Sequence, residues 1–405
     1  MNIKIDHLSG WCEGSLRITG SKSETNRLLL LQALFKGFQL ENISNSDDSK
    51  VMQEALESTS EVVDVHHAGT AMRFLTAYFS HLEGHEVVLT GSTRMQERPI
   101  KLLVDALRSI GASIVYEKAE GFPPIRIKGK KLLGGTISLP ADISSQYISA
   151  LLLLGPVLEK GLKLNLVGKI TSIPYIKMTL TLLNNLGITT SFKDQLIWVG
   201  SAKKIKRINQ VVESDWSSAS YFFSIVALAK KAKISLMSFK KSSLQGDVVL
   251  LDIYEQLGVS SRFEEDTLHL KKENKPLPNS IQLDLTKTPD IAQTIAVSCY
   301  GLGVGCDLVG LHTLKIKETD RLEALQVELT KLGATIKVTN ESLHLSPDTN
   351  FIENCSISTY NDHRMAMAFA PLALKIPLKI EDSSVVSKSY PDFWNDLRKL
   401  NFEIK

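Results

Sequence analysis

Apolar residues follow a pattern that recurs about every 70 residues along this chain, and a fixed period is the mark of repeat architecture. Each copy contains a helix that is apolar nearly all round, and such a helix is buried on every side. We expect these helices at residues 147–154, 221–229, 291–300 and 365–374. An alternating strand follows each first helix, at residues 38–43, 86–90, 162–167, 233–237, 306–309 and 378–380.

A second, amphipathic helix follows each of these strands. Its copies end alike, because Gly or Asn adopts the left-handed conformation that terminates a helix. The endings are Ile110-Gly111, Leu186-Gly187, Leu257-Gly258, Leu332-Gly333 and Leu400-Asn401. A pair of strands then follows, as at residues 112–116 and 124–128. The repeat unit therefore has the order βαβαββ.

Two irregular repeats indicate how the chain divides. The first repeat is truncated, with one helix at 47–57 and one strand before His67, and the last lacks a partner strand. Residues 1–20 hold two unassigned strands, so we predict that the N-terminus crosses over to complete the final unit. The expected domains are 21–213, with repeats one to three, and 1–20 plus 214–405, with repeats four to six. The hinges would lie near residues 20 and 214, and two domains suit a chain of 405 residues.

Composition narrows the class of protein. Hydrophobic residues make up 43% and charged residues 22%, with a formal net charge of +3, which argues against a nucleic-acid binder. The longest apolar runs fall far short of a membrane span, and the N-terminus alternates like a strand, unlike a signal peptide. The four cysteines lack CxxC spacing, so we expect reduced thiols rather than a disulfide or a metal site. A cytoplasmic protein without membrane or nucleic-acid partners is expected.

Six helix starts carry residues suited to holding an anion. They lie at residues 22–27, 69–73, 144–146, 215–218, 290–293 and 362–364. A helix N-terminus has unpaired N–H groups and about half a positive charge, so it attracts anions before any side chain contributes. Several such ends with Lys and Arg nearby indicate a site for multiply phosphorylated or carboxylated small molecules.

Basic and hydroxyl side chains mark the starts in the first half. Lys22 and Arg27 can reach one ligand while Ser23 caps the helix, although a capped helix with solvated basic residues is the alternative. The spacing of a P-loop is absent. Ser144, Ser145 and Gln146 form a neutral phosphate cradle or an ordinary cap, and Ser172 holds the matching place at the next helix.

The remaining candidates combine cations with carboxylates. Arg98 precedes a proline-started helix and binds either an anion or Glu97. Lys317, Glu318 and Arg321 share a helix start, where Glu318 exchanges a proton or only forms local ion pairs. Asp290 is an N-cap or a general base. His363, Arg364 and Lys388 follow in the last repeat, and no metal-ligand spacing appears, since His66 and His67 point to opposite faces of a strand.

These motifs, in their order and spacing, resemble the 5-enolpyruvylshikimate-3-phosphate synthase family over nearly the whole chain. The matching segments are 20–27, 68–73, 97–100, 144–146, 215–221, 245–247, 289–290, 317–321, 362–367 and 388–391. The resemblance implies a two-domain inside-out α/β barrel, each domain made of three βαβαββ repeats, with the site in the interdomain cleft. It also implies a reaction in which phosphoenolpyruvate donates its enolpyruvyl group to the 5-hydroxyl of shikimate 3-phosphate and phosphate is released. No cofactor and no metal are implied, and we expect a monomer.

The resemblance also implies roles for individual residues. Shikimate 3-phosphate would contact Lys22, Ser23, Arg27, Ser144, Ser145, Gln146, Ser172, Asp290 and Lys317. Phosphoenolpyruvate would contact Lys22, Gly69, Arg98, Gln146, Arg321, Arg364 and Lys388. Asp290, Glu318 and Lys22 would be catalytic. The chain departs from the family pattern at His67, Phe74 and Thr313.

Three alternative functions remain to be separated. A UDP-N-acetylglucosamine enolpyruvyl transferase would carry a loop cysteine, and residues 91–98 contain none. An RNA 3′-phosphate cyclase would need a nucleophilic histidine, for which His363 is a poor candidate. A noncatalytic anion-binding protein would have lost Asp290 or Glu318, and both carboxylates are present.

Overall fold

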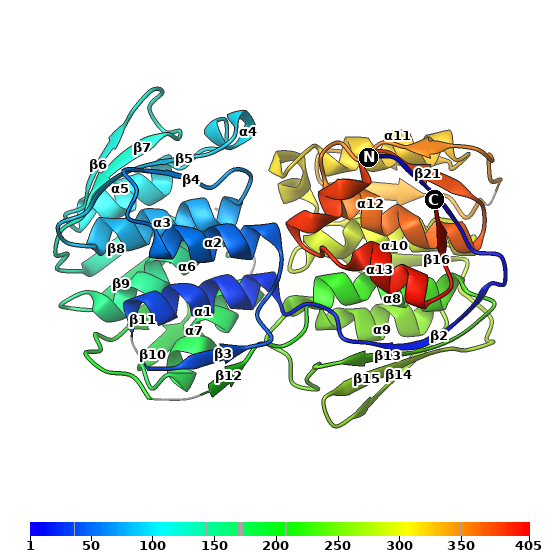
Figure 1. Ribbon diagram of the computed structural model, residues 1–405, viewed down its shortest axis with the longest axis horizontal. Helices are drawn as coiled ribbons and strands as arrows, with labels where there is room; N and C mark the ends of the chain where they lie inside the picture. Colours follow the sequence, from blue (N-terminus) through cyan, green and yellow to red (C-terminus); the bar gives the residue numbers. More distant parts are fainter. Residues whose placement is uncertain (36, 142–143, 169, 171–172, 207–208, 349) are drawn as a thin grey trace. The chain divides into compact units, whose positions relative to one another are not determined.

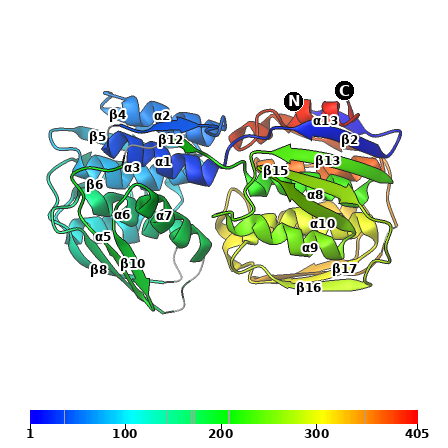
Figure 2. The ribbon, with the colours of Figure 1, turned by 90° about the horizontal axis from the view of Figure 1, so that it is seen from below.

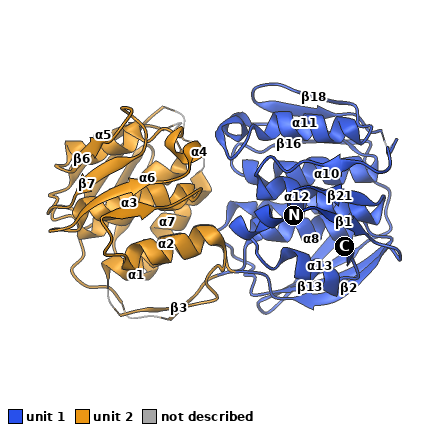
Figure 3. Cartoon of the chain, turned by 45° about the horizontal axis from the view of Figure 1, so that its top comes forward, with its two compact units in different colours: residues 1–19, 213–405 blue, residues 20–212 orange. Residues whose placement is uncertain are grey.

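The computed structural model describes residues 1–35, 37–141, 144–168, 170, 173–206, 209–348 and 350–405 (Figure 1). The chain forms two compact units (Figure 3). Unit 1 comprises Met1–Thr19 and Glu213–Lys405, and unit 2 comprises Gly20–Val212. The chain therefore passes between the units twice, once after Thr19 and once after Val212.

Two repeats of unit 2 share one topology. The second repeat contains β4 (Val62–Asp64), α3 (Gly69–His81), β5 (Glu86–Thr90), α4 (Thr93–Gln96), α5 (Lys101–Ser109), β6 (Ser113–Tyr116) and β7 (Ile125–Lys128). The third contains β8 (Gly135–Pro140), α6 (Ser145–Leu154), η1 (Gly155–Val157), β9 (Leu162–Val167), α7 (Ile173–Asn185), β10 (Thr190–Lys193) and β11 (Leu196–Val199). Their sheets have the orders β4-β5-β7-β6 and β8-β9-β11-β10. In each, the first two strands are parallel and the other pairs are antiparallel.

The first repeat is short, as the sequence predicts. It contains α1 (Lys22–Leu34), β3 (Gln39–Glu41) and α2 (Asp47–Glu57). Its sheet consists of β3 and β12 (Asn209–Val211), which pair in parallel. The described part of this repeat therefore lacks the strand pair that closes the other repeats.

Unit 1 holds repeats four to six. The fourth contains α8 (Trp216–Leu228), β13 (Lys231–Met237), η2 (Gly246–Val249), α9 (Leu250–Gln256), β14 (Val259–Glu264) and β15 (Thr267–Lys272). The fifth contains β16 (Ser280–Asp284), η3 (Pro289–Ile291), α10 (Ala292–Leu302), β17 (Gly305–Val309), η4 (His312–Ile316), α11 (Arg321–Lys331), β18 (Ile336–Val338) and β19 (Ser342–Leu345). The sixth contains β20 (Ser356–Ile357), α12 (His363–Phe369), η5 (Ala370–Leu374), β21 (Leu378–Ile380), η6 (Ser383–Lys388), α13 (Phe393–Lys399) and β22 (Glu403–Ile404).

The N-terminal segment completes two sheets of unit 1. Strand β1 (Ile3–Asp6) pairs with β21 and β22, so it completes the sixth repeat as predicted. Strand β2 (Trp11–Leu16) instead pairs in parallel with β13 and supplies the first strand of the fourth repeat (Figure 2). The prediction that the N-terminal segment completes the final unit is therefore wrong for this second strand, which belongs to the sheet of the fourth repeat.

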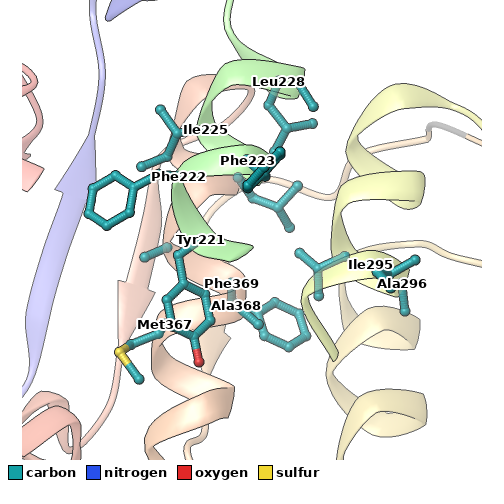
Figure 4. Packing of buried hydrophobic residues seen from close by; sticks show 14 of the residues in the cluster. Tyr221, Phe222, Phe223, Ile225, Leu228, Ile295, Ala296, Met367, Ala368 and Phe369 are labelled. Atoms are coloured by element: carbon teal, nitrogen blue, oxygen red, sulfur yellow. The ribbon is translucent and has the colours of Figure 1, made fainter. Parts of the chain in front are cut away.

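The apolar first helices form the centre of each unit. In unit 1, α8, α10 and α12 pack together, and Phe223, Ile295 and Phe369 lie in the buried cluster among these helices (Figure 4). In unit 2, α1, α3 and α6 pack against one another. The sheets bury one face against these helices, as Ile234 and Leu236 of β13 do. The predicted α/β fold with buried helices is confirmed. None of the helices in the described part of the chain has the length and apolarity that crossing a bilayer requires.

Candidate active site

Seven charged side chains of unit 1 gather at the starts of the helices of repeats five and six and at the end of η6. We call them the unit 1 charge cluster: Asp290, Lys317, Glu318, Arg321, Asp362, Arg364 and Lys388. The cluster brings together six residues that the sequence predicted as site residues and adds Asp362. It contains four cations and three carboxylates, so one positive charge is in excess.

Arg321 connects three carboxylates from different segments. Its Nη1 lies 2.8 Å from Asp290 Oδ1, and its Nη2 lies 2.8 Å from Glu318 Oε2. Its Nε donates to Asp362 Oδ2 at 2.6 Å. Because the side chain is only 2% exposed, these bonds replace the solvation that the guanidinium loses on burial. Arg321 therefore orients the two carboxylates that the sequence analysis proposed as proton carriers.

Asp290 is surrounded by cations. Lys317 Nζ lies 3.5 Å from its Oδ1, and Arg364 Nη2 lies 3.5 Å from its Oδ2. Burial alone would raise the pKa of Asp290, but Lys317, Arg364 and Arg321 outweigh it and hold the pKa well below the ordinary value. In this arrangement Asp290 is ionised and is a weak base. It does not cap a helix: it lies within the short 3-10 helix η3, whose N-cap is Thr288.

Glu318 links Arg321 to the last repeat. Its Oε1 lies 2.9 Å from Nζ of Lys388, which ends η6. The sequence places these two residues 70 positions apart, in repeats five and six. Asp362 caps α12 by accepting a hydrogen bond from the backbone N–H of Arg364 at 2.9 Å. The side chain of Arg364 donates through Nη1 to the carbonyl of Asp290 at 3.1 Å.

Asp247 is a neighbouring carboxylate that the site prediction missed. It is a buried residue of η2 and accepts a hydrogen bond from Ser217 Oγ near the start of α8. Burial, opposed by the Ser217 hydrogen bond and reinforced by the negative charge of Asp290, raises the pKa of Asp247 to about 6. Its segment, residues 245–247, was among the family-like motifs, but no charge pattern in the sequence marked it as a site residue.

Lys22 and Arg27 of unit 2 lie at the start of α1. Lys22 Nζ is 3.2 Å from Asp48 Oδ2, a partner that the sequence analysis did not identify. The helix is capped by Ser21, not by Ser23, which corrects the expected cap. Ser23 instead accepts, through its carbonyl, a hydrogen bond from Arg27 Nη1 at 2.7 Å.

Arg27 is buried without a carboxylate among its described hydrogen-bond partners. Its Nε donates to Thr179 Oγ1 and its Nη2 to Ser149 Oγ, each at 2.8 Å. Its Cζ lies 5.5 Å from the ring centre of Phe74 and 5.7 Å from that of Tyr175. Burial lowers the pKa of Arg27 to about 10, so it stays charged near neutrality. Phe74, noted as a departure from the family pattern, is part of this arginine's packing.

Gly69 and Arg98 are in close contact. A Cβ atom added to Gly69 would lie 2.6 Å from Arg98 Nη1, so only glycine leaves room for the guanidinium in this position. In the described structure Glu97 pairs with Arg94 and not with Arg98. The alternative interpretation, in which Arg98 only forms a salt bridge with Glu97, is therefore excluded.

Arg73 lies near Arg98 and was not predicted as a site residue. It donates to the carbonyls of Gly69 at 3.3 Å and Pro99 at 3.0 Å. Burial lowers its pKa to about 10, and the positive charge of Arg98 adds to that effect. Two neighbouring arginines form no ion pair with the carboxylates of the described residues, which is the arrangement expected where an anion binds.

The start of α6 contains the polar cradle predicted from the sequence. Ser144 caps the helix by accepting from the N–H of Gln146 at 3.4 Å, and the Gln146 side chain donates to Thr70 Oγ1 at 3.2 Å. Ser145 is the first residue of the helix and is partly exposed. Ser172 lies outside the described residues.

Two further expectations concern histidine and metals. His67 hydrogen-bonds through Nδ1 with Ser92 Oγ at 2.8 Å. No group of three or more potential metal ligands occurs within the described ranges. All four cysteines are free thiols.

The chain belongs to the EPSP synthase family. The family model described as EPSP synthase (3-phosphoshikimate 1-carboxyvinyltransferase) matches residues 54–397. A 3-phosphoshikimate 1-carboxyvinyltransferase from Bacteroides fragilis is 47% identical over 97% of this chain and 96% of its own length. One from Mannheimia haemolytica is 36% identical over 96% of this chain and 97% of its own length.

Solved structures share the fold. An EPSP synthase from Acinetobacter baumannii superimposes with a TM-score of 0.82 at 20% identity, covering 100% of this chain and 99% of that one. The enolpyruvyl transferase NikO from Streptomyces tendae has a TM-score of 0.74 at 15% identity, covering 100% and 98%.

Proposed function

We propose that the chain transfers the enolpyruvyl group of phosphoenolpyruvate to the 5-hydroxyl of shikimate 3-phosphate and releases phosphate. The observation that carries this proposal is the bridge from Arg321 to both Asp290 and Glu318 within a cluster of excess positive charge. Membership of the EPSP synthase family supplies the substrates. Two carboxylates held beside cations suit a reaction that joins two anions and moves two protons.

The proposed ligands of the substrates are the residues that the family resemblance implies. Shikimate 3-phosphate binds Lys22, Ser23, Arg27, Ser144, Ser145, Gln146, Ser172, Asp290 and Lys317. Phosphoenolpyruvate binds Lys22, Gly69, Arg98, Gln146, Arg321, Arg364 and Lys388. Each substrate is multiply negative, so the cations offset the repulsion between them. Holding the two reactants in the reactive geometry supplies about 7–11 kcal/mol of the barrier.

The reaction proceeds by addition and elimination. The 5-hydroxyl of shikimate 3-phosphate attacks C2 of phosphoenolpyruvate, and the methylene carbon of phosphoenolpyruvate gains a proton. This addition forms a tetrahedral intermediate. Loss of phosphate and of a methyl proton then forms the enol ether. Asp290 takes the hydroxyl proton, Glu318 handles the methyl proton, and Lys22 supports the leaving phosphate.

Substrate binding increases the basicity of Asp290. In the free protein Lys317, Arg364 and Arg321 keep its pKa low. Lys317 and Arg364 are also proposed ligands of the anionic substrates. When they turn toward phosphate and carboxylate groups, the positive potential at Asp290 falls and its affinity for a proton rises. Asp290 thus becomes a competent base when the acceptor hydroxyl is present.

The test is an assay of phosphate release by the purified protein. With shikimate 3-phosphate and phosphoenolpyruvate together, we expect stoichiometric phosphate and enolpyruvyl product, and with either compound alone we expect none. Replacing shikimate 3-phosphate by UDP-N-acetylglucosamine distinguishes the two transferases. Turnover with the UDP-sugar, or no turnover with the shikimate compound, would refute the proposal. The protein is further proposed to act as a cytoplasmic monomer. Gel filtration with light scattering measures the molar mass and thereby tests the oligomeric state.

A further inference from the structure

A second cationic site lies on unit 1, apart from the residues of the unit 1 charge cluster. It is a cavity of about 590 Å³ where the ends of β2, β13 and β15 meet. Five lysines line it: Lys230, Lys231, Lys233, Lys271 and Lys272. None of the lining residues belongs to the charge cluster, so this cavity is not part of the proposed active site.

Helix α8 separates the two sites. Lys272 Nζ donates to the carbonyl of Ala227 near the end of α8 at 2.5 Å. Ser217, at the other end, bonds to Asp247, whose pKa responds to the charge of Asp290. Ala227 lies ten residues after Ser217, which corresponds to about 15 Å along the axis of α8.

The cavity concentrates positive charge. Its lining has five lysines and two glutamates, a formal excess of three positive charges, which equals the formal net charge of the whole chain. Glu273 is already engaged, since its Oε1 lies 3.0 Å from Lys271 Nζ and accepts from Ser260 Oγ at 2.8 Å. The other glutamate, Glu13 of β2, lies directly opposite Lys233 of β13. Two glutamates against five lysines leave three positive charges of the lining without a carboxylate to balance them.

The lysines also oppose one another directly. Lys233 of β13 is the cross-strand partner of Lys271 of β15, and like charges directly opposite destabilise a sheet. Burial lowers the pKa of Lys272, and the neighbouring Lys375 lowers it further. Burial likewise lowers the pKa of Lys375, and the positive charge of Lys230 lowers it further. A bound anion relieves this repulsion, whereas solvent alone only screens it.

We infer that this cavity binds a small molecule that carries two or more phosphate groups. Its volume lies within the range of about 300–1,000 Å³ that is typical of small-molecule sites. Lysine ammonium groups bind phosphate as point charges, whereas planar recognition of carboxylates favours arginine, which the lining lacks. The ligand would contact lysines from two strands at once and thereby stabilise their pairing.

Trp11 provides a local reporter of the cavity. Its ring is part of the lining, and Lys231 Nζ lies 4.5 Å from the ring centre. Binding of an anion to Lys231 changes the field at this indole. The other tryptophans, Trp198, Trp216 and Trp394, do not line the cavity.

The experiment is a titration of the 5-fluorotryptophan-labelled protein with inorganic pyrophosphate, followed by fluorine NMR at constant ionic strength. A Trp11→Phe variant identifies the Trp11 resonance. We expect this resonance to shift saturably, with a Kd below about 1 mM, while the resonance of Trp198 in unit 2 stays in place. The proposed active site also attracts phosphate, but Trp11 reports only on the cavity, so failure here leaves the proposed function intact.

Matched variants decide whether the lysines form a site. In the triple variant Lys230→Ala, Lys233→Ala, Lys271→Ala we expect at least tenfold weaker binding, with the Trp11–Lys231 pair retained. The control removes three exposed lysines of unit 2, Lys163→Ala, Lys193→Ala and Lys203→Ala, with the same change in net charge, and we expect a change below twofold. Equal weakening in both variants, or no Trp11 shift in the parent protein, would overturn the inference. Citrate binding more tightly than pyrophosphate would overturn the assignment to phosphates.

Discussion

Arg321 donates through Nε to Asp362 Oδ2 at 2.6 Å, and both side chains are almost wholly buried. This bond joins the start of α11 to the N-cap of α12, so it sets the spacing of two helix ends. From that fixed position the same guanidinium reaches Asp290 and Glu318. The proposed proton carriers are therefore oriented by a residue whose own position depends on Asp362.

Asp362→Asn tests this dependence. Asn still caps α12, so the change mainly removes a charge-assisted hydrogen bond, and Asp290 and Glu318 continue to neutralise Arg321. We expect a loss of about 2–3 kcal/mol in the free energy of unfolding by urea. The exposed Asp382→Asn is the control, with an expected change below about 0.5 kcal/mol. An equally small effect of both changes would show that the buried bond contributes little.

Asp290→Asn and Glu318→Gln test the proposed chemistry. Each removes a proton acceptor while keeping its shape, so kcat should fall by about 10²–10⁴ when both substrates are saturating. Phosphate release measures kcat, and calorimetry measures whether substrates still bind. Glu323→Gln, an exposed change on α11, should retain parent activity. Near-normal turnover in either carboxylate variant would remove that residue from the mechanism.

Gly69→Ala tests the contact with Arg98. A new Cβ would displace the end of the Arg98 side chain, which is flexible, so folding stability should change little. The anion contact should weaken, and we expect the KM for phosphoenolpyruvate to rise at least about tenfold, as for the loss of one charge-assisted hydrogen bond. Arg98→Ala should act in the same direction. Arg94→Ala, which removes an exposed arginine of the same segment, should leave KM unchanged.

Asp247→Asn tests a pH effect on stability. The pKa of Asp247 is about 6 in the folded chain and about 3.9 when unfolded. Because the folded state binds the proton more tightly, ionisation costs stability as the pH rises from about 4 to 6, and the cost is complete above that range. At pH 7.5 the variant should be more stable than the parent by about 2–3 kcal/mol in urea unfolding. The difference should shrink toward pH 4, and a difference that is constant with pH would contradict the assignment.

Features set by local sequence were predictable, whereas features set by contacts between distant segments were not. The buried helices and the Gly-ended second helices were predictable because their signals lie within a dozen residues of sequence. The truncated first repeat was predictable for the same reason. The caps were not all predictable, since Ser21 rather than Ser23 caps α1 and a choice between neighbouring serines depends on backbone angles.

The repeat order, the buried helices and the candidate charged residues were predictable from the sequence, because periodicity and residue type are properties of short segments. The pairing of β2 with β13 and the bonds of Arg321 to three carboxylates depend on the folded arrangement. The raised pKa of Asp247 and the contact of Gly69 with Arg98 depend on it as well. The physical reason is that burial and Coulomb interactions depend on distances through space, and segments far apart in the chain set those distances.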